Sequence, residues 1–381
     1  MRKQLLTLLF SIVCITIQAQ EYFFREDSAI IRGRIINYSP TMDFRYLSTT
    51  IADVFKDSIS IETTKINADG TFEKHLLLQH PIFNWFYTSQ DYMGIQQIPF
   101  YLCPGDTLNI NVRFDDGMIP ECDYRGGHAV DVARLLKVRN NVISLQKNCN
   151  SFAGDIDEFN HFADSLYSVQ TSEINKQADR LHYTSFERRL ALCDFASNWG
   201  YAYLSYFKKA RDKIIGKDST ALFKIGSAEM ERLSKTETYP LLKRLPNADS
   251  LMFATRFFPN YFNHLRWSTP MRYPLYTKRG IVWENTIENV IEELSIYRDT
   301  AQHLFASSED TILAQLIYLN CLNIVAIDWL NEGNACEYFY NVGSFLTYPV
   351  IDEMSKKLYD IIEDEEDLID SLPEVKCTDL G

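Results

Sequence analysis

Strict alternation of apolar and polar residues between positions 107 and 114 constrains this chain more than any other feature. The apolar members are Leu108, Ile110, Val112 and Phe114. A period of two places one face of a β-strand on a core and the other face in water. Residues 59–66, 71–78 and 96–102 carry comparable strand patterns, and turn residues at positions 67–70 and 104–106 separate them. The stretch 59–114 therefore predicts a run of short antiparallel strands.

Three more strand patterns lie beside this stretch. They cover residues 29–38, 45–55 and 81–88, and they are rich in branched and aromatic side chains. Short strands with turn signals between them are typical of an antiparallel β-sandwich. We expect a β-sandwich domain over residues 21–122, with its last strand ending near Pro120.

Helical periodicity replaces the alternation after residue 127. Two capping boxes, Asp155 with Glu158 and Thr184 with Glu187, mark helix starts. Further helical patterns cover residues 130–142, 221–233, 282–297, 311–330 and 351–362, whereas prolines restrict residues 239–279 to short helices and one at position 349 interrupts another pattern. The predicted fold class is α+β, with an all-α helical domain over residues 127–372. Paired helices resembling a small solenoid are the alternative for that domain.

The first twenty residues have the pattern of a secretory signal peptide. A basic start precedes a short apolar region, and Ala19 precedes a polar stretch. We expect removal of residues 1–19, with cleavage after Gln20 as the alternative, and a periplasmic or secreted mature protein. The apolar region is shorter than the about 20 residues that span a bilayer, so no transmembrane span is expected after cleavage. A lipoprotein anchor at Cys14 is disfavoured, because branched Val13 stands where such signals carry a small residue.

Acidic residues outnumber basic ones. The sequence holds 38 Lys and Arg against 51 Asp and Glu, and the loss of two basic residues with the leader moves the net charge from −13 to −15. A surface of that sign repels phosphate backbones, which disfavours nucleic acid as a partner. We expect instead an unidentified protein or small-molecule partner in the cell envelope.

The cysteines are scattered along the chain. They are Cys14, Cys103, Cys122, Cys149, Cys193, Cys321, Cys336 and Cys377. No two have the Cys-x-x-Cys spacing of a redox motif, and the apolar helical patterns around Cys193 and Cys321 predict buried thiols. Cys103 and Cys122 both lie in the β-rich region, and they can pair only if their Cα atoms come within about 7 Å.

Aromatic residues in the proline-rich stretch are the best candidates for a ligand-binding surface. They are Phe257, Phe258, Tyr261, Phe262 and Trp267. Aromatic side chains line many small-molecule sites, but loops that pack on a helical layer need the same residues as apolar anchors. The histidines show no metal-ligand spacing, and the sequence contains no Gly-x-Ser-x-Gly motif. The sequence therefore predicts no catalytic, cofactor-binding or metal-binding residues.

Three segments resemble a known family. They are Gly33-Arg34-Ile35, residues 66–72 (Ile-Asn-Ala-Asp-Gly-Thr-Phe) and residues 100–108 (Phe-Tyr-Leu-Cys-Pro-Gly-Asp-Thr-Leu). Together they resemble the N-terminal, DUF4369-like domain of exported TlpA-like thiol:disulfide oxidoreductases from Bacteroidetes. The resemblance covers about residues 28–135 and continues more loosely along the helices. It implies a non-catalytic β-rich domain, then a helical segment, then a thioredoxin domain with a Cys-x-x-Cys motif.

The chain departs from that family at its C-terminal end. Residues 345–349 resemble the stretch before the thioredoxin domain and residues 373–381 resemble its lead-in, but the thioredoxin domain itself is missing. Redox exchange needs two neighbouring thiols, one of them with a lowered pKa, so the family's catalytic residues match no positions here. We expect an exported non-catalytic binding or scaffolding protein. The alternative is a truncated thiol:disulfide oxidoreductase that has lost its thioredoxin domain.

Overall fold

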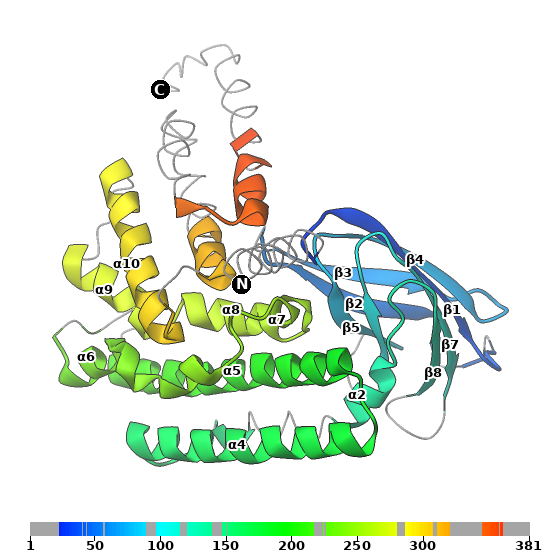
Figure 1. The fold of residues 1–381 in the computed structure, drawn as a ribbon, viewed down its shortest axis with the longest axis horizontal. Helices are drawn as coiled ribbons and strands as arrows, with labels where there is room; N and C mark the ends of the chain where they lie inside the picture. Colours follow the sequence, from blue (N-terminus) through cyan, green and yellow to red (C-terminus); the bar gives the residue numbers. More distant parts are fainter. Residues whose placement is uncertain are drawn as a thin grey trace, which may run out of the picture.

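A β-rich N-terminal region is followed by a helical region, which confirms the predicted α+β class (Figure 1). The computed structural model describes residues 23–39, 41–42, 44–55, 58–88, 97–114, 120–138, 147–149, 151–216, 224, 226–279, 286–307, 311–320, 345–357 and 359–360. The predicted signal peptide, Cys321 and the C-terminal residues 361–381 lie outside this part. Among the described helices, none combines the length and the apolar character that crossing a bilayer requires.

The β-rich region is a sandwich of two four-stranded sheets (Figure 1). Its strands are β1 (Asp27–Ile35), β2 (Tyr46–Asp53), β3 (Ser58–Lys65), β4 (Thr71–Leu78), β5 (Ile82–Tyr87), β6 (Gln97–Leu102), β7 (Thr107–Arg113) and β8 (Glu121–Arg125). One sheet has the order β4-β1-β7-β8 and the other has the order β3-β2-β5-β6. The first seven strands lie close to their predicted positions.

The strand pairing differs from the prediction at one place. β1 and β7 run parallel, from Ile30 opposite Thr107 to Ile35 opposite Val112, whereas the other pairs are antiparallel. The two predicted turns explain this difference, because they join β3 to β4 and β6 to β7, and in each case the joined strands belong to different sheets. The chain therefore changes sheets at these turns instead of forming hairpins.

The eighth strand was not predicted, and it carries the sheet beyond Pro120. In β8, Cys122 lies opposite Val112 and Tyr124 lies opposite Ile110 of β7. These two side chains are half-buried, whereas the three charged residues between and beside them are exposed. An edge strand with so many charges has a weak apolar pattern, which is why alternation alone did not identify it.

The helices follow the sandwich in chain order. They are α2 (Val132–Val138), α4 (Ile156–Arg180), α5 (Ser185–Ile215), α6 (Ala228–Ser234), α7 (Leu251–Ala254), α8 (Phe258–Arg266), α9 (Thr269–Arg279) and α10 (Ile287–Phe305), with the 3₁₀ turns η1 (Thr236–Thr238) and η2 (Pro240–Arg244). Residues 312–320 and 349–357 are also helical. Both predicted capping boxes are confirmed, at the starts of α4 and α5.

Three helix boundaries correct the sequence-based expectations. α6 begins at Ala228 rather than near residue 221, because Ser227 caps it by accepting the backbone N–H of Met230. Pro349 is the first residue of a helix instead of an interruption, a position where its missing N–H costs nothing. α9 continues through Pro274, so the proline-rich stretch holds a longer helix than predicted.

β5 separates the core of the sandwich from the core of the helical region. All six of its residues are buried, so both of its faces are covered. Phe86 packs inside the sandwich, whereas Phe83 and Trp85 belong to the apolar cluster that runs through the helices. Phe83 also forms a parallel bridge with Thr255, directly after α7. Burial of aromatic side chains on both faces therefore couples the two regions.

Candidate functional site

The five aromatic residues predicted to bind a ligand do not form one surface. Phe258, Tyr261 and Phe262 are buried in the helical core, and Phe257 is half-buried against it. None of these four residues lines the cleft described next, so they act as apolar anchors of the helical core. Trp267 is different, because 41% of its surface is exposed.

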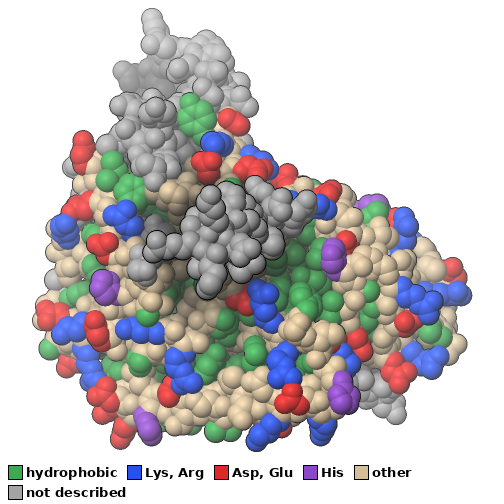
Figure 2. Space-filling model, viewed as in Figure 1, with side chains coloured by type: hydrophobic (Ala, Val, Ile, Leu, Met, Phe, Trp, Pro, Cys, Tyr) green, Lys and Arg blue, Asp and Glu red, His purple; other side chains and the backbone are tan. Residues whose placement is uncertain are grey.

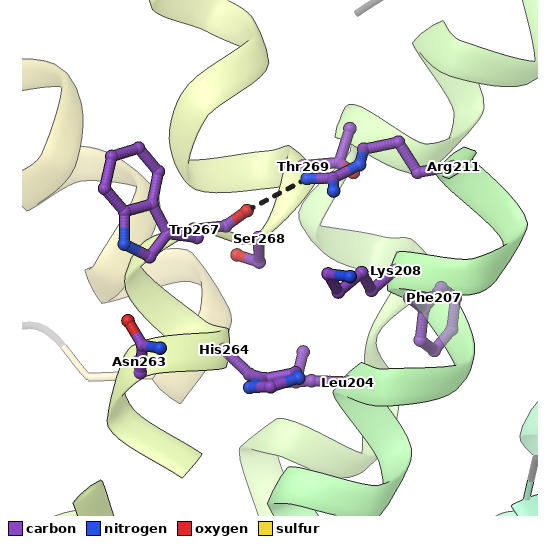
Figure 3. Close-up of a pocket in the computed structure, with 9 residues that line it drawn as sticks. All are labelled: Leu204, Phe207, Lys208, Arg211, Asn263, His264, Trp267, Ser268 and Thr269. Atoms are coloured by element: carbon purple, nitrogen blue, oxygen red, sulfur yellow. Dashed lines mark hydrogen bonds between the residues drawn. The ribbon is translucent and has the colours of Figure 1, made fainter. Parts of the chain in front are cut away.

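Trp267 lies at the rim of a cleft between α5 and the junction of α8 with α9 (Figure 3). The cleft has a volume of about 260 Å³. It is lined by Leu204, Phe207, Lys208, Arg211, Asn263, His264, Trp267, Ser268 and Thr269. The aliphatic and aromatic members give it apolar walls, and the others place polar groups around those walls. Such a combination is typical of small-molecule sites.

Two cations of α5 reach into this cleft. Arg211 donates to the Trp267 carbonyl oxygen at 3.4 Å, across the cleft (Figure 3). Arg211 and Lys208 share one carboxylate, Asp212, at 2.8 Å and 3.4 Å. The two cations bring positive charge to the lining of the cleft, and the Asp212 carboxylate lies beside both of them.

Charges of both signs occur on the helical surface. On the face drawn in Figure 2, acidic and basic side chains are interspersed over the helices. Some charged side chains of the helices form ion pairs, such as Arg189 with Asp249 and Arg232 with Asp157. Exposed pairs of this kind contribute only about 0–1 kcal/mol each to stability. The cleft thus places two cationic side chains, Lys208 and Arg211, on an acidic protein.

A buried hydroxyl group completes the polar lining. Ser268 is 9% exposed, and its Oγ has no hydrogen-bond partner among the described residues. Leaving a buried polar group unpaired costs about 1–3 kcal/mol, and a ligand that accepts a hydrogen bond from this hydroxyl removes the cost. An acceptor placed in the cleft would pair with this hydroxyl.

His264 is a neutral imidazole at neutral pH. Burial, together with the positive charges of Lys208 and Arg211, lowers the pKa of the His264 imidazole below its ordinary value of 6.5. Its Nδ1 donates to the Asn260 carbonyl oxygen at 3.1 Å, since a carbonyl can only accept. An anion in the cleft would offset the neighbouring positive charges and raise this pKa.

The described cysteines show no redox pair. Among the described cysteines, Cys103, Cys122, Cys149 and Cys193 form no disulfide, so the pairing of Cys103 with Cys122 that the sequence left open does not occur. Cys193 is buried, as predicted. Burial raises the pKa of Cys149 to about 12 and that of Cys103 to about 11, which keeps both thiols protonated at neutral pH, in the form that does not attack disulfides.

Comparison with known proteins adds no relative. No model of a known protein family matches the sequence, and no curated protein matches it. The resemblance to TlpA-like oxidoreductases therefore stays an expectation from its three segments, and the chemistry of the chain has to be argued from its own side chains.

Proposed function

We propose that this chain is an exported binding protein whose helical region captures a small anion with an apolar body in the cleft between α5 and α8. The convergence of Lys208, Arg211 and the unpaired Ser268 hydroxyl on apolar walls carries this proposal. A carboxylate or comparable oxyanion accepts hydrogen bonds from all three groups. The apolar part of the ligand lies against Leu204 and Phe207.

Binding of a matched pair of probes tests the proposal. 2-Naphthoate and 2-naphthamide share one ring system and differ in charge, and titration calorimetry on the mature chain gives the dissociation constant of each. We expect the carboxylate to bind more tightly than the neutral amide. Arg211→Gln should weaken carboxylate binding by roughly tenfold or more, because a hydrogen bond to a charged group contributes about 1.5–3 kcal/mol.

A neighbouring lysine provides the matched control. Lys209 is exposed on α5 and does not line the cleft, so Lys209→Gln removes the same charge as Lys208→Gln one residue away. Carboxylate binding should fall in Lys208→Gln and stay near the wild-type value in Lys209→Gln. Equal binding of the acid and the amide, or equal losses in the two lysine variants, would overturn the proposal.

The exported location and the non-catalytic role are part of the same proposal. The signal-peptide pattern of residues 1–19 supports export. The raised pKa of Cys103, which forms no disulfide, supports a role other than thiol exchange. N-terminal sequencing of the processed protein should begin at Gln20 or Glu21. An insulin-reduction assay should show no turnover above the reductant alone, and clear turnover would favour the truncated oxidoreductase instead.

A further inference from the structure

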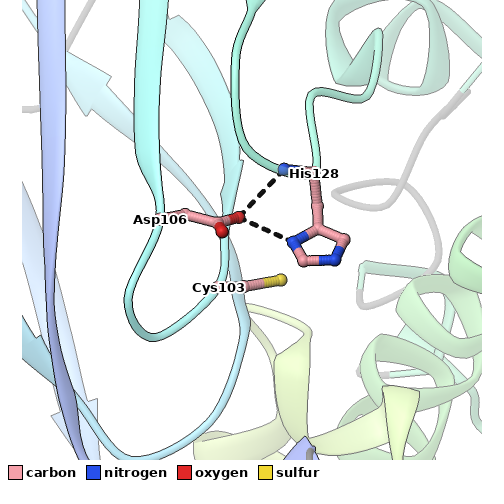
Figure 4. Close-up of side chains that lie close together, drawn as sticks. All are labelled: Cys103, Asp106 and His128. Atoms are coloured by element: carbon pink, nitrogen blue, oxygen red, sulfur yellow. Dashed lines mark hydrogen bonds and ion pairs between the residues drawn. The ribbon is translucent and has the colours of Figure 1, made fainter.

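Three potential metal ligands meet in the β-sandwich, and none of them lines the helical cleft (Figure 4). Cys103 directly follows β6, Asp106 directly precedes β7, and His128 lies in the loop after β8. The Cys103 sulfur, a carboxylate oxygen of Asp106 and an imidazole nitrogen of His128 all lie within 4.8 Å of one another. In Figure 4 the thiol and the carboxylate both point toward the imidazole ring.

The loop after β8 is built to hold His128 against Asp106. Asp106 Oδ2 accepts hydrogen bonds from the His128 backbone N–H and from Nδ1, both at 2.9 Å. Gly126 and Gly127 have φ values of 81° and 49°, a region that side chains disfavour. A Cβ atom at Gly127 would come within 2.8 Å of the Asp106 carboxyl group. The two glycines therefore permit a close approach that another residue would block.

We propose that Cys103, Asp106 and His128 bind a divalent metal ion of the zinc class. Thiolate sulfur, imidazole nitrogen and carboxylate oxygen are the three protein ligands that Zn²⁺ prefers, and three ligands with one open position are typical of zinc sites accessible to solvent. The His128 side chain is 72% exposed and that of Asp106 is 14% exposed, so the ion can enter from solvent and keep a water molecule at the fourth position.

The same geometry disfavours a catalytic cysteine. In cysteine hydrolases a histidinium lowers the thiol pKa, whereas here burial and the negative charge of Asp106 raise the pKa of Cys103. A negative carboxylate opposes a thiolate but attracts a cation. The nearby positive group, Arg25, donates to the Pro104 carbonyl oxygen at 3.0 Å and pairs with Asp27. Metal binding replaces the S–H bond of Cys103 by a sulfur–metal bond and releases the proton to solvent.

Cobalt and zinc titrations of the mature chain test this proposal. Co²⁺ bound to a thiolate gives a ligand-to-metal charge-transfer band in the near ultraviolet, and Zn²⁺ should displace it at one equivalent per chain. We expect Cys103→Ser to abolish the band. His128→Ala and Asp106→Asn should each weaken Zn²⁺ binding by roughly tenfold or more, the scale seen when groups that hold a metal in place are removed.

Two variants provide matched controls outside the cluster. Cys122 is a half-buried cysteine on β8 that forms no disulfide, and His75 is an exposed histidine that contacts Glu73. Cys122→Ser and His75→Ala should bind Zn²⁺ as the wild type does. Zn²⁺ should also raise the melting temperature of the wild type and not that of Cys103→Ser, because only a folded site binds the ion. A wild type without the charge-transfer band, or a band that survives in Cys103→Ser, would overturn the proposal.

Discussion

His80 lies in a cage of aromatic rings between the sandwich and the helices. Its ring centre is 6.2 Å from that of Phe24, 6.1 Å from that of Phe55 and 6.5 Å from that of Phe253. Nδ1 donates to the Pro81 carbonyl oxygen at 2.8 Å. Burial lowers the pKa of His80 below its ordinary value of 6.5, because the cage disfavours the charged imidazolium.

This buried histidine should make the fold sensitive to acid. The unfolded chain binds a proton as the pH falls through 6.5, whereas the folded chain binds it only at lower pH, so stability falls below pH 6.5. His80→Phe removes the titrating group and keeps an aromatic ring in the cage. At pH 8 we expect the free energy of unfolding of the variant to be about 1 kcal/mol below that of the wild type, because the hydrogen bond to Pro81 is lost. On acidification, the free energy of unfolding should fall less in the variant than in the wild type.

Urea unfolding between pH 8 and pH 5 measures this effect. His161 is exposed on α4, so the stability of His161→Phe should fall on acidification by the same amount as that of the wild type. If the free energy of unfolding of His80→Phe falls as much on acidification as that of the wild type, His80 is not the source of the acid sensitivity. Sequence alone could not separate His80 from the other histidines, because Phe253, which closes its cage, lies far along the chain.

At the scale of single elements, the start of α5 depends on one threonine. Thr184 Oγ1 accepts the backbone N–H of Glu187 at 3.2 Å, and the Glu187 carboxylate accepts the N–H of Thr184 at 2.8 Å. Thr184→Ala removes the first of these bonds and should lower the free energy of unfolding by about 1 kcal/mol. Ser185→Ala changes the next, exposed residue and should cost much less. Equal losses in the two variants, measured by urea unfolding, would contradict the capping role.

The packing of α5 on α8 depends on a glycine. A Cβ atom at Gly200 would lie 2.5 Å from Cδ2 of Tyr261 and 3.0 Å from a methyl carbon of Leu245. Gly200→Ala gains about 1 kcal/mol of helix propensity, but overpacking a core costs about 1–3 kcal/mol. The Tyr261 hydroxyl donates to Asn247 Oδ1 at 2.8 Å, which holds the ring in place, so we expect a net loss of stability.

Thermal unfolding of a second variant separates the clash from other effects. Tyr261→Leu removes the ring that the new methyl group would meet. In that background Gly200→Ala should cost less or become neutral, because the clash with the ring is gone and only the 3.0 Å contact with the Leu245 methyl carbon opposes the propensity gain. If Gly200→Ala lowers stability equally with and without Tyr261→Leu, the clash with the Tyr261 ring is not the cause of the loss.

These elements also show what local sequence can and cannot predict. The two capping boxes were predictable because each is complete within four residues. The parallel pairing of β1 with β7 was not, because it depends on which sheet each strand joins after the turns at Gly70 and Gly105. The sequence indicates a possible ligand-binding surface at the aromatic residues of α8, because their spacing does not reveal that α5 covers them.

At the scale of the whole molecule, β5 should make the sandwich and the helices unfold together. Phe83 is 1% exposed and faces the helical core. Phe83→Ala should lower the free energy of unfolding by about 3–5 kcal/mol. Hydrogen exchange should show β1 and α5 losing protection to the same extent, although only α5 belongs to the helical region. Loss of protection confined to α5 would mean that the two regions unfold separately.

Both proposed sites combine residues that are distant in sequence. The cleft joins residues 204–211 to residues 263–269, and the metal cluster joins the β6–β7 turn to the loop after β8. A motif search finds binding side chains that are all close together in the sequence, whereas each of these sites needs two separate segments of the chain. Sequence reasoning named only Trp267 of the cleft, and it named Cys103 only as one partner of a disulfide that the structure does not contain.

A crystal structure with a halogenated probe tests the proposed binding role most directly. 6-Bromo-2-naphthoate carries a carboxylate on one end of its ring system and a bromine atom on the other, and anomalous scattering locates the bromine. We expect a bromine peak in the cleft between α5 and α8, with the carboxylate within hydrogen-bond distance of Lys208, Arg211 or Ser268. A cleft without the probe, or a carboxylate turned toward solvent with no contact to these groups, would contradict the proposal.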